Sequence, residues 1–206
     1  MNITASGHSV YRNYIKRPID LFSALLLLIL LSPIFLIVFV VLRLTTKDSA
    51  FYQQERVGQY GKTFQIYKFR TLPKNTPILV GKQRVKIRNR VSKFARFLRS
   101  TSIDELPQLI NVVKGDMSLI GPRPVVPQEA ELTDLREASG ALSVKPGLTG
   151  LAQVNGRKHL GNMQKADFDA KYAERLTFLG DVAIILRTLP IIIERDGVRK
   201  FFKKRY

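Results

Sequence analysis

An uncharged and strongly apolar run of 22 residues lies near the start of the chain, from Leu21 to Leu42. A straight helix of this length would match the hydrocarbon core of a bilayer, about 30 Å thick. Ser32 and Pro33 stand at its midpoint, however. A proline inside a helix removes one hydrogen bond and clashes with the carbonyl four residues earlier. The sequence therefore predicts a break that leaves two arms of about 10 residues each.

Positive charges flank both ends of this run, with Arg12, Lys16 and Arg17 before it and Arg43 and Lys47 after it. Cations at both ends do not select one orientation under the positive-inside rule. A re-entrant hairpin, with both ends on the cytoplasmic face, satisfies both flanks. The carbonyl freed by Pro33 then needs a donor, which the Ser32 hydroxyl or neighbouring protein can supply. A kinked helix that crosses the bilayer is the alternative.

Lysine and arginine outnumber acidic residues by 34 to 16 in the 206-residue chain, which gives a net charge of +18. Such a charge predicts a polyanionic partner: anionic lipid, a phosphorylated substrate or nucleic acid. The apolar run favours the first two, and no helix-turn-helix or aromatic RNA-binding motif supports recognition of nucleic acid. The chain has no cysteine, which excludes disulfides, a Cys nucleophile and a zinc ribbon.

The patterns after the apolar run predict an α+β domain that is mostly helical. Ala50–Glu55 and Lys62–Arg70 show apolar and aromatic alternation around a Gly-containing turn, which is typical of a β-hairpin. Lys86–Arg99 has apolar residues at helical spacing among cations, so this helix either lies on anionic headgroups or packs its stripe on the core. We therefore expect a membrane-associated re-entrant hairpin over residues 1–48 and a small cytoplasmic domain with interfacial amphipathic helices over residues 49–206.

Two adjacent carboxylates, Asp104 and Glu105, follow a stretch from Arg56 to Ile103 that holds 13 lysines and arginines and no acid. The spacing from Ser102 to Glu105 is that of a capping box, in which Glu105 caps a helix and Asp104 complements its dipole. The same position and the surrounding cations favour the ionised form of Asp104, as a nucleophile requires. Successive helix positions diverge by about 100°. We therefore expect the two carboxylates to divide the roles of nucleophile and metal ligand.

Several charged side chains elsewhere are candidates for the same site. Arg123 stands between two prolines, on a backbone with little freedom, which suits either a bidentate grip on phosphate or a plain surface loop. Lys68 and Arg70 alternate along a predicted strand and project from one face. Arg157 stands at the end of a segment, residues 145–157, in which two predicted turns surround a short strand. Asp169 lies on a predicted helix, where an acid that faces the basic site could support a cation or a metal.

Four segments carry a combined pattern: Ser32-Pro33 in the apolar run, K-F-R-T at 68–71, S-I-D-E-L-P-Q-L-I-N-V-V-K-G-D-M-S-L-I-G-P-R-P at 102–124, and K-P-G-L-T-G-L-A-Q-V-N-G-R at 145–157. Together they resemble the bacterial sugar transferase family, in particular its small monotopic polyprenyl-phosphate phosphoglycosyl transferases. The resemblance implies an enzyme on the cytoplasmic face of the bacterial inner membrane. Its reaction moves a sugar 1-phosphate from a UDP-sugar to undecaprenyl phosphate, releases UMP and initiates surface glycan assembly.

The resemblance also implies roles for individual residues. Asp104 matches the nucleophile that forms an aspartyl phosphosugar, and Glu105 matches a ligand of Mg²⁺. Arg70 and Arg123 match phosphate-binding residues, and Asp169 matches a functionally important acid.

The sequence departs from the family pattern at Leu72-Pro73-Lys74, where members commonly have Met and acidic residues. This departure puts the donor-side loop in doubt, and the choice of UDP-sugar stays open. The alternative to an enzyme is a membrane-anchored module that binds anionic lipid or nucleic acid without turnover. The acidic pair, Asp104 and Glu105, distinguishes the two, because a binding module needs no carboxylates inside a cationic pocket.

Overall fold

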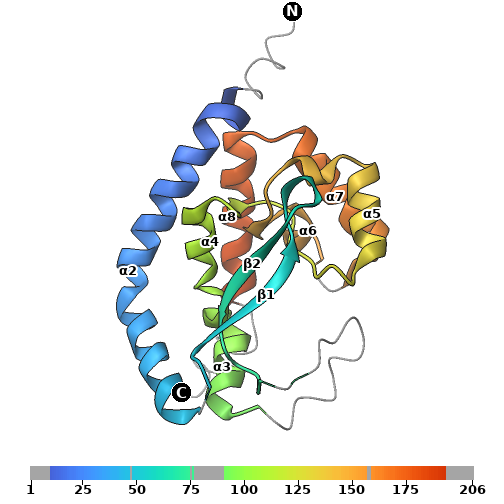
Figure 1. The fold of residues 1–206 in the computed structure, drawn as a ribbon. Coiled ribbons are helices and arrows are strands. Elements are labelled where there is room, and N and C mark those ends of the chain that lie inside the picture. The colour runs from blue at the N-terminus through green and yellow to red at the C-terminus, as the bar shows by residue number, and fades with distance from the viewer. Residues whose placement is uncertain (1–9, 47, 75, 77–90, 157–158, 194–206) are drawn as a thin grey trace, which may run out of the picture.

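A single long helix covers one flank of a small mixed domain (Figure 1). The computed structural model describes residues 10–46, 48–74, 76, 91–156 and 159–193. The π-helical turn η1, Tyr11–Ile15, continues directly into α2, Lys16–Thr45, which contains the apolar run. In Figure 1, α2 is a curved helix on the side of the molecule opposite α5 and α7.

The remaining elements form the domain that α2 covers. In chain order they are β1 (Phe51–Val57), η2 (Gln59–Gly61), β2 (Thr63–Phe69), α3 (Lys93–Thr101), η4 (Ile103–Glu105), α4 (Gln108–Lys114), β3 (Ser118–Ile120), α5 (Ala130–Ala138), η5 (Ala141–Ser143), β4 (Gly147–Thr149), α6 (Leu151–Val154), α7 (Asn162–Glu174) and α8 (Phe178–Ile193). Strands β1 and β2 form an antiparallel hairpin, and β3 pairs in parallel with β4. The predicted α+β class, the helical majority and the β-hairpin are confirmed.

Helix α2 continues through Ser32 and Pro33 without interruption. Pro33 leaves the Ile29 carbonyl without its amide donor, and the Ser32 hydroxyl donates to that oxygen at 2.8 Å. Because the lost bond is replaced locally, the helix does not divide into two separate arms. The predicted break is therefore not confirmed, and the re-entrant hairpin remains a prediction. Among the described residues, Tyr11–Thr45 is the one helix long and apolar enough to cross a membrane.

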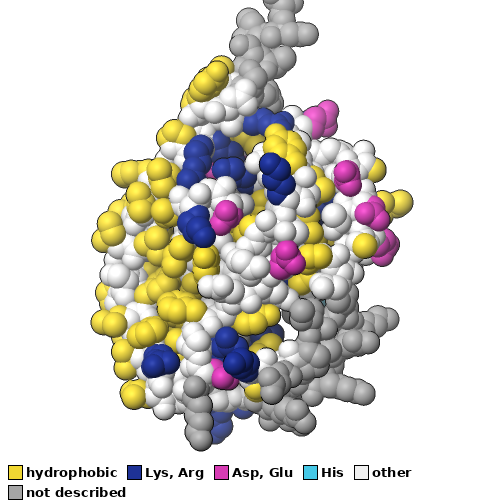
Figure 2. All heavy atoms as spheres, in the orientation of Figure 1, with side chains coloured by type: hydrophobic (Ala, Val, Ile, Leu, Met, Phe, Trp, Pro, Cys, Tyr) yellow, Lys and Arg dark blue, Asp and Glu magenta, His cyan; other side chains and the backbone are white. Residues whose placement is uncertain are grey.

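One face of α2 packs against the domain along most of its length. Ala24 lies in an apolar cluster with Val112 of α4, and Val38 lies in another with Phe69 and Leu98. The other face of α2 exposes large apolar side chains, including Phe22, Ile29, Leu30, Leu36 and Ile37. Figure 2 shows this hydrophobic surface along the flank formed by α2. An exposed apolar surface of this extent favours contact with lipid.

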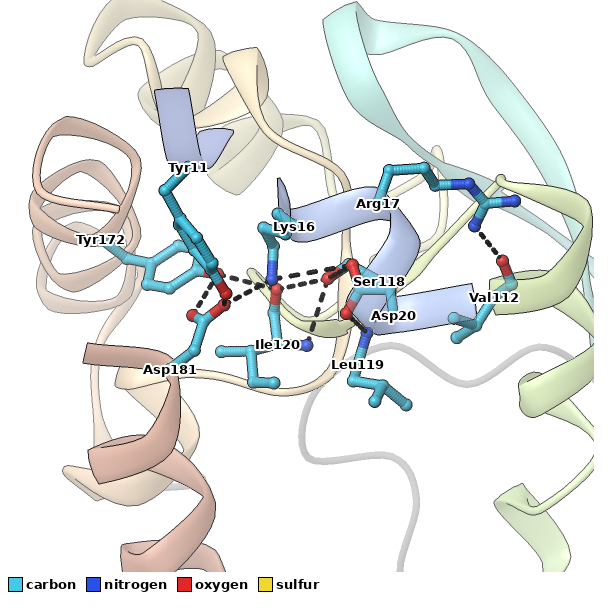
Figure 3. A network of polar contacts seen from close by, with 10 residues as sticks. All are labelled: Tyr11, Lys16, Arg17, Asp20, Val112, Ser118, Leu119, Ile120, Tyr172 and Asp181. Carbon is cyan, nitrogen blue, oxygen red and sulfur yellow. Dashed lines mark hydrogen bonds and ion pairs between the residues drawn. The ribbon is translucent and has the colours of Figure 1, made fainter. Parts of the chain in front are cut away.

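A buried polar network joins the start of α2 to the domain (Figure 3). Lys16 Nζ and the Tyr11 hydroxyl both donate to Oδ2 of Asp181 on α8, each at 2.7 Å. Asp20 accepts a hydrogen bond of 2.7 Å from the Ser118 hydroxyl. Lys16, Asp20 and Asp181 are all buried. Each of these charges therefore depends on its partners rather than on water.

We expect Asp181→Ala to lower the free energy of unfolding by about 3 kcal/mol, because Lys16 is left buried with only Asp20, 3.7 Å away, to compensate it. Thermal unfolding of the detergent-solubilised protein measures this loss. The matched control is Asp167→Ala, which removes an exposed ion pair with Lys171 and should cost less than about 1 kcal/mol. Equal losses in the two variants would contradict a network that holds α2 in place.

Candidate active site

The acidic pair lies in a short turn between two helices. Helix α3 ends at Thr101, Ser102 has a left-handed backbone with φ of 64°, and η4 follows before α4 begins at Gln108. The predicted capping box is wrong, because the Ser102 side chain makes no capping bond and Glu105 bonds to side-chain cations. Glu105 therefore does not cap a helix here, and the interaction of Asp104 with the helix dipole remains a prediction.

Glu105 is held by two cations from different elements. Lys68 Nζ, on β2, lies 3.0 Å from Glu105 Oε1. Arg123, in the loop after β3, places Nη2 2.5 Å from Oε1 and Nη1 3.5 Å from Oε2. Burial alone would raise the pKa of Glu105, but Arg123 and Lys68 outweigh it and hold that pKa below its usual range. Glu105 is therefore ionised at neutral pH.

Asp104 lies in a different environment from its neighbour. The residue is 9% exposed, and its carboxylate forms no hydrogen bond or ion pair within the part of the chain that the structure describes. Burial raises the pKa of Asp104 to about 6, and the charge of Glu105 acts in the same direction against the nearby cations. The expectation that the surroundings favour ionisation is wrong in direction, because desolvation outweighs the cations. A pKa of about 6 still leaves most of the carboxylate ionised at pH 7.

Two arginines at the site were not singled out by the sequence. Arg99, in the last turn of α3, favours the ionised form of Asp104. Arg136, on α5, donates through Nη1 to the backbone carbonyl of Arg123 at 3.0 Å. Arg99 stands five residues before Asp104 in a basic helix, which was a usable signal. Arg136 gave no local signal, because its buried partner Asp169 lies 33 residues further along the chain.

Of the two cations predicted to project together from β2, only Lys68 reaches the acidic pair. Arg70 donates through Nε and Nη2 to the carbonyls of Ser49 and Phe51, at 2.9 and 3.2 Å. These bonds fasten the start of β1 to the end of β2. In the described structure Arg70 therefore stabilises the hairpin, and its predicted contact with phosphate remains a prediction.

The last two predicted site residues are further from the acidic pair. Asp169 is 1% exposed and pairs with Arg136, so it contacts Arg123 only through that guanidinium. Arg157 lies outside the described residues. The structure thus brings together Asp104, Glu105, Lys68 and Arg123 directly, and Asp169 indirectly.

Comparison with known proteins covers nearly the whole chain. The model of the family described as bacterial sugar transferase matches residues 11–195, which include α2, the β-hairpin and the acidic pair. The chain belongs to the bacterial sugar transferase family. The family predicted from the four sequence segments is therefore confirmed.

Curated relatives of this sugar transferase differ in length. It is 38% identical to the undecaprenyl-phosphate galactose phosphotransferase of Salmonella typhimurium over 89% of this chain and 41% of that protein. It is 38% identical to the exopolysaccharide production protein ExoY of Sinorhizobium fredii over 88% of this chain and 87% of that protein. The UDP-glucose:undecaprenyl-phosphate glucose-1-phosphate transferase of Caulobacter vibrioides is 36% identical over 88% of this chain and 71% of its own length. The chain spans about two fifths of the Salmonella relative and most of ExoY.

The geometry of the sugar transferase site suits attack on a phosphoryl group. Arg123 has a side chain that is 45% exposed, so an incoming phosphate can reach it and exchange for Glu105 as its bidentate partner. Lys68 lies beside it as a second positive charge. A carboxylate that is not engaged in a hydrogen bond or ion pair among the described residues, as Asp104 is, can then approach phosphorus whose charge these cations neutralise.

The donor set of the site fits a magnesium ion that takes much of its coordination from substrate. Within the described ranges no group of three or more His, Cys, Asp or Glu residues could hold a metal. Glu105 and Asp104 nevertheless offer carboxylate oxygens, the ligands that Mg²⁺ prefers, and it commonly combines one or two of these with phosphates and water. A metal here would therefore bind together with a diphosphate rather than in a closed protein cage.

Proposed function

We propose that this sugar transferase moves a sugar 1-phosphate from a UDP-sugar to undecaprenyl phosphate and releases UMP, as the initiating step of surface glycan assembly. The observation that carries the proposal is the Asp104 carboxylate, which forms no hydrogen bond or ion pair among the described residues and lies within the electrostatic influence of Glu105, Lys68 and Arg123. The names of the Salmonella and Caulobacter relatives, which refer to galactose and glucose phosphate transfer with undecaprenyl phosphate, support it.

The proposed reaction has two displacements at one phosphorus atom. An oxygen of Asp104 bonds to the β-phosphorus of the UDP-sugar, and the bond from that phosphorus to the bridging oxygen breaks, so that UMP leaves with this oxygen. A phosphate oxygen of the lipid then attacks the aspartyl phosphosugar, the acyl phosphate bond breaks, and the Asp104 carboxylate is restored. Splitting the transfer avoids bringing two anionic substrates together at once.

The other residues of the site neutralise and position the diphosphate. Arg123 grips two phosphate oxygens with its planar guanidinium, and Lys68 adds a point charge from β2. Glu105 would hold Mg²⁺, which when bound neutralises charge on the diphosphate and on the departing UMP. Glu105 also keeps Arg123 and Lys68 oriented before the substrate binds.

The test of this function is release of UMP by membranes or detergent-solubilised protein supplied with undecaprenyl phosphate, Mg²⁺ and a panel of UDP-sugars. We expect release of UMP with at least one UDP-sugar. Repeated turnover, with more UMP than enzyme, should require the lipid. A non-catalytic module that binds anionic lipid would bind vesicles but release no UMP. No UMP from any UDP-sugar, with a protein that unfolds cooperatively, would overturn the proposal.

We further propose that the protein sits on the cytoplasmic face of the bacterial inner membrane, with α2 re-entrant and bent near Pro33. The exposed apolar face of α2 and the cations at both its ends support this topology. The hydroxyl of Ser32 is compatible with a bend at Pro33, because it satisfies the Ile29 carbonyl where lipid cannot.

Single cysteines at Tyr14 and Ser49, in a chain that has no cysteine of its own, should both resist an impermeant thiol reagent added outside intact cells. Both positions are exposed in the structure, so the reagent would reach either one on the periplasmic side. Replacing Ser32 and Pro33 by leucine should straighten α2 toward spanning and expose one of the two cysteines. Labelling of one end alone in the otherwise unchanged protein would rule out re-entry.

A further inference from the structure

A buried ion pair joins two helices behind the site. On α5, Arg136 donates through Nε and Nη2 to Oδ2 of Asp169 on α7, at 2.9 and 2.6 Å. Arg136 is 4% exposed and Asp169 is 1% exposed, so neither can touch a substrate that arrives from solvent. The remaining arm of the guanidinium, Nη1, donates to the backbone carbonyl of Arg123 at 3.0 Å. The ion pair is therefore connected through Arg136 to Arg123, the residue whose side chain binds Glu105.

The loop that carries Arg123 is fixed at each carbonyl from Pro122 to Val125. The donors come from four separate groups: the Gly147 amide, the Arg136 guanidinium, the Arg56 guanidinium and the Val57 amide. The other three donors bond to the carbonyls of Pro122, Pro124 and Val125, whereas Arg136 bonds to the carbonyl of Arg123 itself. The direction of that bond depends on Asp169, because the carboxylate determines where the planar guanidinium points.

We propose that Asp169 and Arg136 are positioning residues, which orient the Arg123 peptide so that its side chain meets the phosphate and Glu105. This inference rests on the proposed function and gives a physical role to an acid that the sequence marks only as important. Asp169 acts through two successive contacts, first on Arg136 and then on the Arg123 carbonyl. It binds neither metal nor phosphate. Replacing it would leave Arg136 buried without a counter-charge and free to turn away from the loop.

The deciding experiment is a double-mutant cycle on the purified full-length chain. We expect Asp169→Asn to lower kcat/KM for the UDP-sugar by about 10- to 100-fold, as expected for a small displacement of a binding group. In an Arg123→Ala background, which retains measurable activity if Lys68 still binds phosphate, the same change should cost less than about 2-fold. Arg136→Lys keeps the charge but loses the planar fork, so it should behave like Asp169→Asn rather than like the original protein.

The matched control is Tyr11→Phe, which keeps the buried ring and removes one buried hydrogen bond, to Asp181 on α8, that involves no atom of the Arg123 loop. It should lower the melting temperature while leaving kcat/KM within about 2-fold at a temperature where the fold is intact. Equal activity losses from Tyr11→Phe and Asp169→Asn would overturn the proposal. So would additive effects of Asp169→Asn and Arg123→Ala, or an Asp169→Asn variant with unchanged kcat/KM.

A second measurement does not depend on turnover. Hydrogen exchange followed by mass spectrometry should show faster exchange in the peptide covering residues 118–126 of Asp169→Asn, and no change there in Tyr11→Phe, whose lost hydrogen bond lies outside this peptide. Absence of UMP release from the unaltered protein would end the proposed function but not this readout. Unchanged exchange of that peptide in Asp169→Asn would end the positioning role by itself.

Discussion

Asp104→Asn is expected to lower UMP release at least about 1,000-fold and to abolish the covalent adduct that the unaltered protein forms with a labelled UDP-sugar in the absence of lipid. Asparagine keeps the shape of the side chain but offers no anionic oxygen. The measurement is retention of label on denatured protein, together with multiple-turnover UMP release. A variant that turned over near the original rate would show that the lipid phosphate attacks the UDP-sugar directly.

The same substitution, which lowers activity, is expected to raise the stability of the folded protein at pH 8. Burial raises the pKa of Asp104 from 3.8 to about 6, so the folded state binds its proton more tightly than the unfolded state. Stability therefore falls as pH rises from about 4 to about 6, and above that range the ionised carboxylate costs on the order of 2–3 kcal/mol. Asp104→Asn should be more stable than the original protein at pH 8 and lose this gain at pH 4. If Asp104 instead complemented a helix dipole, the variant would be less stable at pH 8.

Activity should depend on pH through the same carboxylate. The nucleophile must be ionised, so kcat/KM should rise about tenfold per pH unit below about 6 and level off above it. Glu105 does not titrate in this range, because Arg123 and Lys68 keep its pKa low. A pH profile that stayed flat down to pH 5 would contradict the assignment of Asp104 as the attacking group.

Removal of Mg²⁺ by excess chelator should abolish UMP release, and Glu105→Gln should lower it by at least about 100-fold in saturating Mg²⁺. The neutral amide is a poorer ligand and no longer balances Lys68 and Arg123. A Glu105→Asp variant keeps the charge on a shorter side chain, so it should recover part of the rate at a higher Mg²⁺ concentration. That recovery separates loss of the metal from loss of folding.

The exposed Glu131→Gln is the matched control for Glu105→Gln, because this acid lies on α5 and bonds only to the Asn162 side chain in the described contacts. It should leave both the rate and the Mg²⁺ dependence unchanged. Full activity of the original protein in excess chelator would contradict the requirement for Mg²⁺. Equal Mg²⁺ dependence of the original protein and Glu105→Asp would remove Glu105 as its ligand.

Local patterns predicted the parts of the fold whose causes are local. The β-hairpin followed from the apolar and aromatic alternation around a Gly-containing turn. Lys86–Arg99 was predicted as one helix, yet α3 begins only at Lys93, because the Ser92 hydroxyl accepts the Ala95 amide and caps it there. The part of that prediction over residues 86–90 lies outside the described residues.

The site was predictable where one short segment supplied its residues and not where distant segments meet. Asp104 and Glu105 stand together in the sequence, and the contrast with their basic surroundings marked them. The raised pKa of Asp104 could not be predicted, since burial depends on packing by elements far away in the chain. Arg136 was missed for the same reason, because its value comes from Asp169 and from the Arg123 carbonyl rather than from its neighbours.

The contact between Lys16 and Asp181 spans 165 residues of sequence, and this separation imposes an order on biosynthesis. A ribosome that adds about 5–20 residues per second produces Asp181 roughly 10–30 s after Lys16. During that interval Lys16 lacks the counter-charge that Asp181 on α8 supplies in the folded protein. The start of α2 can therefore be fixed to α8 only after Asp181 has been synthesised. A ribosome that stalls before α8 therefore leaves Lys16 without this partner, and the polar network of Figure 3 cannot form.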